Sequence, residues 1–370
     1  MDDPAFNGLS GHSVPNMTKR HLAYLACAAA LVASGCGATA DSLPATPGTR
    51  TVRPGDSIQK AVDAAKPGDT ILLAAGTYRE SVRVTTSGLT LRGMGRNTVI
   101  APADKAASNA CAKAGNGICV EGTQGHPVTD TTIASLALTG FSKSGLWSTW
   151  TDRLTVRHVT AEKNKVWGIA QERSTRGVFL DNTARDNGDA GLFLANTVVS
   201  EGGATDTKGA VIARNHLQGN RIGVTVRRLR DLTVMSNDLT ANCAGVFVVG
   251  DENTPRAGAL TVSDNVIRQN NKSCPKTTRL PALQGSGIVL TGAESTLVTR
   301  NTITDHTGKS PLSGGIVLFK SMVGASNERN QITGNTVRRN APADLVNGET
   351  GKGNTFQGNT CGASKPAGLC

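Results

Sequence analysis

Residues 211–226 read VIARNHLQGNRIGVTV, and residues 232–248 repeat the same design as LTVMSNDLTANCAGVFV. In both stretches an alternating apolar segment leads to an Asn, a second Asn follows five residues later, and a Gly then opens another apolar segment. Alternation with a period of two is typical of a β-strand, and Asn and Gly are typical of tight bends. The first Asn residues of the two copies, Asn215 and Asn237, lie 22 residues apart. The stretch therefore predicts a short coil of strands and bends that recurs along the chain.

The spaced Asn pair recurs through much of the sequence. Five pairs keep the spacing of five residues: Asn182/Asn187, Asn215/Asn220, Asn237/Asn242, Asn265/Asn270 and Asn335/Asn340. Two further copies vary: one has Asn301 with His306 in the second slot, and the other has His158 in the first slot with Asn164 one place late. Successive first slots lie 22 to 36 residues apart, which predicts a basic coil of about 22 residues with loops inserted into some coils. The insertions are expected at residues 196–209, 250–258, 271–285 and 307–314.

These coils predict an all-β solenoid, a parallel β-helix. Because alternate residues of a strand point inward, Val211, Ala213 and Leu217 are expected to stack on Leu232, Val234 and Leu239 of the next coil. The Asn side chains are expected to stack in columns and bond to one another. A leucine-rich repeat is excluded because its Leu-x-x-Leu-x-Leu pattern is absent.

The composition agrees with a repetitive β architecture. Only 3% of the 370 residues are aromatic and 43 are Gly, so the core must consist of aliphatic side chains and the chain must turn often. The formal charge of +11 favours anionic partners, such as an acidic polysaccharide or a cell-wall polymer. A basic surface that serves only solubility explains the charge equally well. No tract of Lys and Arg is long enough for a nucleic-acid arm, so no nucleic-acid partner is predicted.

A capping helix is predicted before the coils, in residues 52–78, VRPGDSIQKAVDAAKPGDTILLAAGTY. Asp56 or Ser57 suits the helix N-cap, and Pro67-Gly68 ends the helix. The apolar face of the helix consists of Ile58, Ala61, Val62 and Ala65. A solenoid exposes its first layer, which explains a cap at this position.

The helix, the following Pro-Gly-Asp-Thr-Ile and the Gly-Thr-Tyr at residues 76–78 resemble the N-terminal cap of the pectin-lyase-like superfamily of right-handed parallel β-helices. The Asn and Gly coils are similar to the superfamily's generic β-helix repeats, including NosD-like proteins. The resemblance covers residues 51–370 and implies the fold. It leaves the activity open, because the superfamily contains polysaccharide lyases, hydrolases, epimerases and proteins without known activity.

The N-terminal region has the pattern of a bacterial export signal. A basic segment at residues 17–21 precedes an apolar stretch that is too short to span a bilayer, so residues 17–35 are predicted to be a signal peptide. Ala33-Ser34-Gly35-Cys36 resembles a lipobox, which predicts lipidation at Cys36 and a protein held at the cell surface by a lipid anchor. The alternative is an ordinary signal peptide that is cleaved near residues 38–40, which would release the protein. Residues 1–16 are expected to be an upstream extension, and residues 36–50 a flexible tether before the β-helix of residues 51–370.

Six Cys residues follow the lipobox, and an even number in an exported chain favours disulfides. Pairing by proximity in the sequence gives Cys111–Cys119, Cys243–Cys274 and Cys361–Cys370, one of about fifteen connectivities. The last pair is expected to fix the C-terminal tail over the final coil.

Motifs for a defined chemistry are missing. The paired carboxylates of polygalacturonase-like hydrolases and the Asp-Pro-His motif of alginate epimerases are absent. Asp186-Asn187-Gly188-Asp189 is the nearest acidic group, and a turn between strands explains it better than a Ca²⁺ site. The four His residues beyond the signal occupy different coil positions, so neither a metal site nor another cofactor is predicted.

A column of outward residues suggests a lateral groove. Counted from the Gly of each coil, one outward position holds Thr149, Glu172, Ala195, Arg227, Val249, Thr291 and Phe319, and the next holds Trp150, Arg173, Asn196, Arg228, Gly250, Gly292 and Lys320. Arg227 and Glu172 are the candidate catalytic residues. Arg173, Arg228, Trp147 and Trp150 are the candidate substrate-binding residues, because Arg binds carboxylates and aromatic rings stack on sugars. Phe193, Phe247, Val249 and Phe319 are expected to lie under the inserted loops and not to bind a ligand.

Two functions remain open. The first is binding or modification of an acidic polysaccharide by lyase or epimerase chemistry, in which Arg227 would act as base or neutralise a uronate carboxylate. The second is a non-catalytic surface lipoprotein that binds a glycan or a protein partner along the solenoid. If neither function applies, the outward column is an ordinary solvated β-face with salt bridges. We expect a monomer that contacts the membrane through its lipid anchor only.

Overall fold

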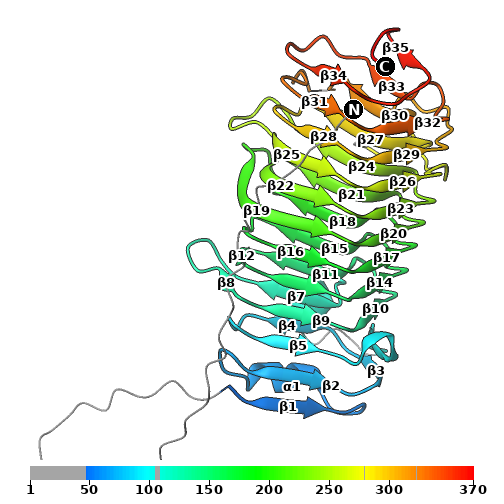
Figure 1. Cartoon of the computed structure of the whole chain (residues 1–370). Coiled ribbons are helices and arrows are strands. Elements are labelled where there is room, and N and C mark those ends of the chain that lie inside the picture. Colours follow the sequence, from blue (N-terminus) through cyan, green and yellow to red (C-terminus); the bar gives the residue numbers. More distant parts are fainter. Residues whose placement is uncertain (1–46, 105–108, 279, 322) are drawn as a thin grey trace, which may run out of the picture. The chain divides into compact units, whose positions relative to one another are not determined.

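The computed structural model describes residues 47–104, 109–278, 280–321 and 323–370 as a stack of short parallel strands (Figure 1). The predicted upstream extension, signal peptide, lipidation at Cys36 and most of the predicted tether lie outside these residues. The first strand begins at Thr49, two residues before the expected start of the β-helix, because it pairs with Thr70–Leu73 of the first coil. In the described part, no helix is both long and apolar enough to cross a membrane.

Three parallel sheets form the sides of the coil. In the described residues, the first sheet contains β1 Thr49–Val52, β2 Thr70–Leu73, β5 Thr90–Arg92, β9 Thr132–Ala134, β13 Thr155–Arg157, β16 Val178–Leu180, β19 Thr205–Ala213, β22 Leu229–Met235, β25 Gly258–Ser263, β28 Leu297–Thr299, β31 Gln331–Thr333 and β34 Thr355–Gln357. The second contains β3 Gly76–Arg79, β6 Thr98–Ala101, β10 Ala137–Thr139, β14 Thr160–Glu162, β17 Thr183–Arg185, β20 His216–Gln218, β23 Asp238–Thr240, β26 Val266–Arg268, β29 Thr302–Thr304 and β32 Thr336–Arg338.

The third sheet carries the candidate site on its outer face. It contains β4 Val82–Val84, β7 Ile118–Glu121, β11 Ser144–Thr149, β15 Trp167–Glu172, β18 Ala190–Ala195, β21 Ile222–Arg227, β24 Ala244–Val249, β27 Ser286–Thr291, β30 Gly314–Phe319, β33 Leu345–Asn347 and β35 Ser364–Lys365. A small separate pair joins β8 Val128–Thr129 to β12 Thr151–Asp152. All of these pairings are parallel, which confirms the predicted parallel β-helix.

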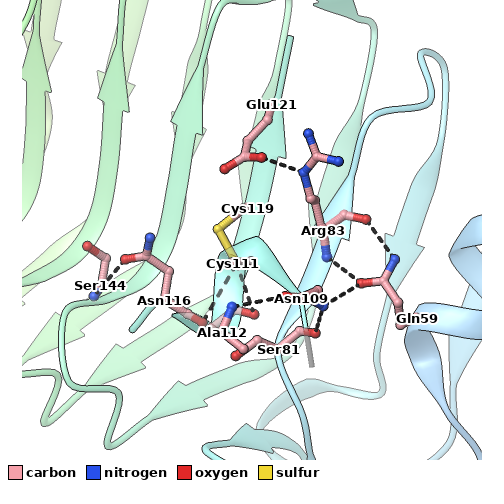
Figure 2. The surroundings of a disulfide bond; sticks show 11 residues. Gln59, Ser81, Arg83, Asn109, Cys111, Ala112, Asn116, Cys119, Glu121 and Ser144 are labelled. Atoms are coloured by element: carbon pink, nitrogen blue, oxygen red, sulfur yellow. Dashed lines mark hydrogen bonds and ion pairs between the residues drawn. A yellow bond between two sulfur atoms is a disulfide. The ribbon is translucent and has the colours of Figure 1, made fainter. Parts of the chain in front are cut away.

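In the part of the chain that the structure describes, three short helices accompany the strands: α1 Ile58–Asp63, α2 Ala110–Lys113 and the 3-10 helix η1 Gly95–Asn97. The helix α1 stands where the sequence predicts a helix, and the Ser57 side chain accepts a hydrogen bond from the Lys60 N–H at its N-terminus. Asn109 caps α2 and also donates to Gln59 of α1, so the segment around the Cys111–Cys119 disulfide is joined to the first coil (Figure 2).

Aliphatic ladders fill the interior, one from each sheet. Leu217 stacks on Leu239 as predicted. The expected inward positions of Val211 and Ala213 are wrong: Ile212 pairs with Val234 and is fully buried, whereas Val211 pairs with Thr233 on the outer face and is half-buried. Arg214 at the bend has a φ of 55° and interrupts the alternation, so counting back from Leu217 in steps of two assigns the wrong face.

Columns of buried amides run along two bends of the coil, as predicted. Where one Asn follows another in a column, its Oδ1 accepts hydrogen bonds from the backbone N–H and the Nδ2 of the preceding Asn. Asn215, for example, donates both to Asn237 at 2.9 Å. Its Nδ2 also donates to the Phe179 carbonyl at 3.0 Å. Every amide is thus satisfied without water, which lets these polar side chains be buried.

One coil differs from the prediction in this column. Val159, not His158, occupies the first slot, because the Val159 N–H donates to Asn182 Oδ1. His158 is exposed and has a φ of 54° at the bend. Asn164 is in register: it bonds Asn187 and lies five residues after Val159.

The three disulfides join the predicted pairs, Cys111–Cys119, Cys243–Cys274 and Cys361–Cys370. The C-terminal tail returns to the stack, where β35 pairs with β33. Disulfides of this kind are typical of proteins in an oxidising compartment outside the cytosol.

Candidate functional site

The outward column of the third sheet has the register that the Gly spacing predicts. Glu172 pairs with Ala195, Ala195 with Arg227, and Arg227 with Val249. The neighbouring positions of Trp150, Arg173 and Arg228 are bends with φ of 50°, 48° and 52°. These side chains therefore leave the end of each strand at the same corner of the coil.

The inserted segment 196–204 covers this corner and contacts the predicted groove residues. Glu172 is 7% exposed and accepts a short hydrogen bond from the Val198 N–H. Arg173 donates to Thr197 Oγ1 at 2.9 Å, and Arg227 donates to the Thr197 carbonyl at 3.2 Å. Arg and Glu side chains that the sequence places in an open groove thus hold a loop against the sheet.

Arg228 is the most enclosed of the predicted residues. It is 3% exposed, donates to the Ser200 carbonyl at 3.2 Å, and forms an ion pair with Asp251 at 3.3 Å. Asp251 belongs to the second insertion, so Arg228 links two inserted loops. Burial of this cation is tolerated because a carboxylate and a carbonyl replace its water.

The Trp side chains form a stack on the same outer face. Trp147 stacks on Trp167 with ring centroids 5.7 Å apart, and Trp167 stacks on Phe193 at 4.5 Å. Trp150 lies apart from this stack, under the guanidinium of Arg173 at 5.7 Å. The predicted aromatic residues therefore fall into two places, and the stack leads towards a cleft.

A cleft of about 690 Å³ lies between the inserted loops. Its floor is the outer face of the strands from β15 to β30, and five strand spacings correspond to about 24 Å. The lining comprises Trp167, Gly188, Asp189, Phe193, Val198, Val199, Ser200, Glu201, Arg221, Ile222, Thr225, Arg227, Arg228, Phe247, Val249, Gly250, Asp251, Thr277, Thr278, Leu280, Thr291, Leu312, Phe319, Ser321 and Val323.

One polar side chain interrupts the apolar floor. Phe193, Thr225 and Phe247 are in register on three successive strands. Phe193 and Phe247 are buried, and Val249 and Phe319 are half-buried, which agrees with the expected cover by inserted loops. The Thr225 hydroxyl is buried and has no hydrogen-bond partner among the described residues.

Asp189 and Arg221 form the polar wall opposite Arg227. Burial raises the pKa of Asp189, while a hydrogen bond from Trp167 Nε1 at 3.0 Å and the charge of Arg221 partly offset this effect. Burial lowers the pKa of Arg221, which is 6% exposed. A carboxyl with a raised pKa in a cleft is a candidate proton donor or acceptor.

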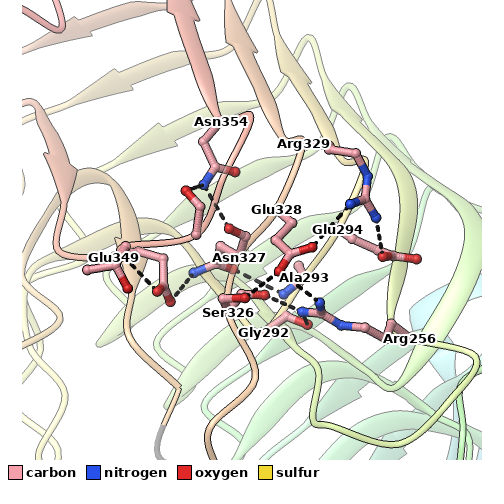
Figure 3. Close-up of polar contacts among 12 residues, drawn as sticks. Arg256, Gly292, Ala293, Glu294, Ser326, Asn327, Glu328, Arg329, Glu349 and Asn354 are labelled. Atoms are coloured by element: carbon pink, nitrogen blue, oxygen red, sulfur yellow. Dashed lines mark hydrogen bonds and ion pairs between the residues drawn. The ribbon is translucent and has the colours of Figure 1, made fainter.

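Covalent and polar links fix the walls. The Cys243–Cys274 disulfide ties the insertion 271–285 to the start of β24, and Arg221 donates to the Pro275 carbonyl at 2.7 Å. On the other side, Arg256 of the second insertion donates to the Ser326 carbonyl and pairs with Glu328 at 3.6 Å (Figure 3). The loops that carry lining residues are therefore tied to the stack by a disulfide and by polar contacts.

Of the residues singled out in the sequence, Arg227 and Arg228 line the cleft, whereas Glu172, Arg173, Trp147 and Trp150 lie outside its lining. Sequence reasoning passed over Asp189, taken as part of a turn, and Arg221 and Thr225. A signal existed: Asp189 and Arg221 each stand two residues before the Gly of their coil, and Thr225 stands two residues after it.

Comparison with known proteins identifies the fold. The family described as right handed beta helix region matches residues 78–257, and the family described as periplasmic copper-binding protein (NosD) matches residues 195–365. No curated protein sequence matches the chain significantly.

Solved structures with a similar fold include the A-module of the mannuronan C-5 epimerase AlgE4 from Azotobacter vinelandii, with 19% identity, a TM-score of 0.56, and coverage of 82% of this chain and 89% of that one. The DFA-IIIase of Arthrobacter chlorophenolicus A6 without its lid has 15% identity and a TM-score of 0.56, with coverage of 83% and 82%. The Dettilon tailspike protein has 12% identity and a TM-score of 0.54, with coverage of 85% and 68%.

The copper in the NosD description finds no matching ligand set in the described residues. No group of three or more His, Cys, Asp and Glu side chains there is placed to hold a metal ion. Within the matched region, His306 is buried between two Asn side chains, His216 is at the surface beside Asp238, and the three Cys form disulfides. What the matches share is the architecture: the chain has the fold of the right-handed parallel β-helix proteins.

Proposed function

We propose that this chain is an exported β-helix protein whose cleft on the third sheet binds an acidic polysaccharide. The observation that carries the proposal is the cleft itself, with aromatic side chains along its floor and Arg227 at its edge. Aromatic faces bind the apolar faces of sugar rings, and a guanidinium binds a carboxylate. The similar fold of a mannuronan epimerase supports a polysaccharide as the ligand.

Modification of the bound polysaccharide is the second candidate. Elimination and C-5 epimerisation of a uronate both begin with removal of the C-5 proton, which is easier once the neighbouring carboxylate is neutralised. Arg221, whose charge acts on Asp189, would supply the positive charge, and Asp189 would accept or return the proton, because its raised pKa brings the two protonation states closer in energy. Arg227 stands at the opposite end of β21 and would bind another carboxylate of the polymer. Glu172 has no part in this scheme, since it is buried under the loop 196–204.

Binding is tested with purified protein and oligosaccharides of galacturonate and mannuronate, by calorimetry. Arg227→Gln should weaken binding at least tenfold, because the charged hydrogen bond is lost. Arg214→Gln is the matched control: Arg214 is an exposed guanidinium paired with Asp181 at 2.8 Å on another corner of the coil. Equal affinity of the native protein and Arg227→Gln would contradict the assignment of the cleft.

Catalysis is tested on the same oligosaccharides. Formation of an unsaturated uronate, followed by its absorbance, reports elimination, and incorporation of solvent deuterium at C-5 reports epimerisation. Asp189→Asn should abolish either signal and leave binding within a factor of a few. Binding without either signal in the native protein would favour the non-catalytic scaffold.

We further propose that the protein is anchored at the cell surface through Cys36 and acts as a monomer. Residues 17–36 support the anchor by their sequence, and the disulfides support export. Metabolic labelling with a radioactive fatty acid tests the anchor, with Cys36→Ser as the control that should lose the label. Sedimentation of the soluble part tests the monomer.

A further inference from the structure

Asp189 and Arg221 are neighbours on successive coils, yet their side chains bind different partners. The Arg221 N–H donates to the Asp189 carbonyl at 2.9 Å, so the two residues are stacked. The Asp189 carboxylate accepts instead from Trp167 Nε1 at 3.0 Å. The Arg221 guanidinium donates to the Pro275 carbonyl at 2.7 Å and to the Pro281 carbonyl at 3.3 Å. The two groups therefore act on each other as charges, without a hydrogen bond between them.

Both charges are costly where they lie. Arg221 is 6% exposed, its two carbonyl partners are uncharged, and its Nε has no hydrogen-bond partner among the described residues. Burial lowers the pKa of Arg221 and raises the pKa of Asp189, because a charged group loses its hydration in a buried site. A buried cation needs an anion beside it, and the anion that the fold provides is itself disfavoured by burial.

The charged surroundings of Asp189 are simple. Among the described residues, Arg221 is the charged group that acts on the Asp189 carboxyl. Lys165, in the preceding coil, is exposed. Glu201 and Asp251 line the same cleft from the inserted loops, and neither they nor Lys165 shift the pKa of Asp189. The protonation of Asp189 is therefore set by its burial, its hydrogen bond and the charge of Arg221.

We infer that the carboxylate of a bound uronate replaces the Asp189 carboxylate as the anion beside Arg221, and that Asp189 takes up a proton as the sugar binds. The net charge of this wall is the same before and after binding, because the anion of the ligand replaces the anion of the protein. The neutral Asp189 carboxyl donates a hydrogen bond to the ligand, whereas an ionised one would repel it. This inference rests on the proposed function and specifies where its acidic sugar lies and how binding depends on pH.

The affinity for a uronate should fall as the pH rises. Below the pKa of Asp189 in the free protein, binding takes up no proton and the affinity is highest. Above this pKa, each pH unit lowers the affinity by about tenfold, until the pKa of Asp189 in the complex is passed. Removal of the C-5 proton needs an ionised Asp189, so any turnover should rise with pH over the range in which the affinity falls.

Calorimetry in two buffers with different ionisation enthalpies measures the protons taken up on binding. The probes are galacturonate hexasaccharides in the acid form and as the full methyl ester, and a mannuronate pair repeats the comparison. At pH 7 the native protein should take up a proton with the acid form and none with the ester. Its affinity for the acid form should fall by about tenfold between pH 6 and pH 8, with little change for the ester.

Four variants assign the proton. Asp189→Asn keeps a hydrogen-bond donor but cannot titrate, so it should bind the acid form without proton uptake and equally well at pH 6 and pH 8. Glu201→Gln is the matched control, because it removes another carboxylate of the cleft lining and should keep the proton uptake. Arg279 follows Thr278 in the sequence and lies outside the described residues, and Arg279→Gln should also keep the proton uptake. Arg221→Gln should lose the preference for the acid form over the ester, and its melting temperature reports whether it folds.

The outcomes separate this inference from the proposed function. Binding of the acid form without proton uptake would overturn the inference and leave the proposed function standing. Proton uptake that Asp189→Asn retains, or that Glu201→Gln or Arg279→Gln removes, would do the same. Failure of the acid form and the ester of both sugars to bind would overturn the proposed function and this inference together.

Discussion

We predict that His306 makes the stability of this β-helix depend on pH. It replaces an Asn in the buried column, where Asn270 Nδ2 lies 3.1 Å from His306 Nε2 and Asn340 Oδ1 lies 2.8 Å from His306 Nδ1. An amide nitrogen donates and an amide oxygen accepts, so the neutral ring with its proton on Nδ1 fits the column. A protonated ring would present a second N–H to the Asn270 donor.

Burial lowers the pKa of His306 to about 4, from a usual value of 6.5. The unfolded chain therefore takes up a proton at a higher pH than the folded chain does. The contribution of His306 to stability is fully present above pH 6.5 and is lost as the pH falls towards 4. A shift of 2.5 pKa units corresponds to about 3 kcal/mol, of which about 2 kcal/mol is lost by pH 5.

The charged groups around this ring do not titrate in the same window. Asp305 is paired with Arg339 at 2.6 Å, which lowers the pKa of its carboxyl to about 2, so it stays ionised. Its negative charge raises the pKa of His306, but less than burial lowers it. Asp344, which accepts from Asn340, lies one step further along the column.

The experiment compares native protein with His306→Asn by urea unfolding at several pH values from 7.5 to 4.5. The substitution restores the ordinary amide, so the variant should lack the loss of about 2 kcal/mol between pH 6.5 and pH 5. His216→Asn is the control, because His216 is half exposed beside Asp238 and lies outside the column. If native protein and His306→Asn lose stability in parallel over this range, the assigned protonation of the column is wrong.

Three further predictions concern the column and the cleft. Asn237→Ala should lower the free energy of unfolding by about 3 kcal/mol, because it leaves buried donors and acceptors unsatisfied. Asn359→Ala, at the less buried end of the column, should lower it less, and urea unfolding of both variants measures the difference. Replacing Cys243 and Cys274 together by Ser should cost at most about 4 kcal/mol and weaken ligand binding more than an equally destabilised core variant does, because the loop wall loosens. Asp189→Asn should raise the melting temperature at pH 7, since the buried carboxylate is costly there, and a lower value would refute the raised pKa.

The coil could be predicted because its signals are local. The spacing of Asn215 and Asn220 is fixed by the bends on either side of a three-residue strand, and every coil that stacks on this one must repeat it. Counting from each Gly likewise placed Glu172 and Arg227 in one column, since strands of parallel coils keep their register.

The face of some residues could not be predicted from alternation alone. Arg214 adopts a left-handed conformation at the bend, and this extra turn moves Ile212 inward in place of Val211. The same conformation at His158 moves Val159 into the column. The pattern of apolar and polar residues does not indicate which residue adopts the left-handed conformation at the bend, because Arg, His, Asp and Ser all adopt it in this protein.

The sequence by itself determined the architecture and the amide columns of this protein, because each depends on a short pattern that the coils repeat. Only the tertiary structure decided which groups form the cleft. The loop 196–204 folds over Glu172, and the insertion 271–285 brings its carbonyls to Arg221, through contacts that span up to 60 residues. Such contacts depend on how irregular loops pack across several coils, and no repeat encodes that packing.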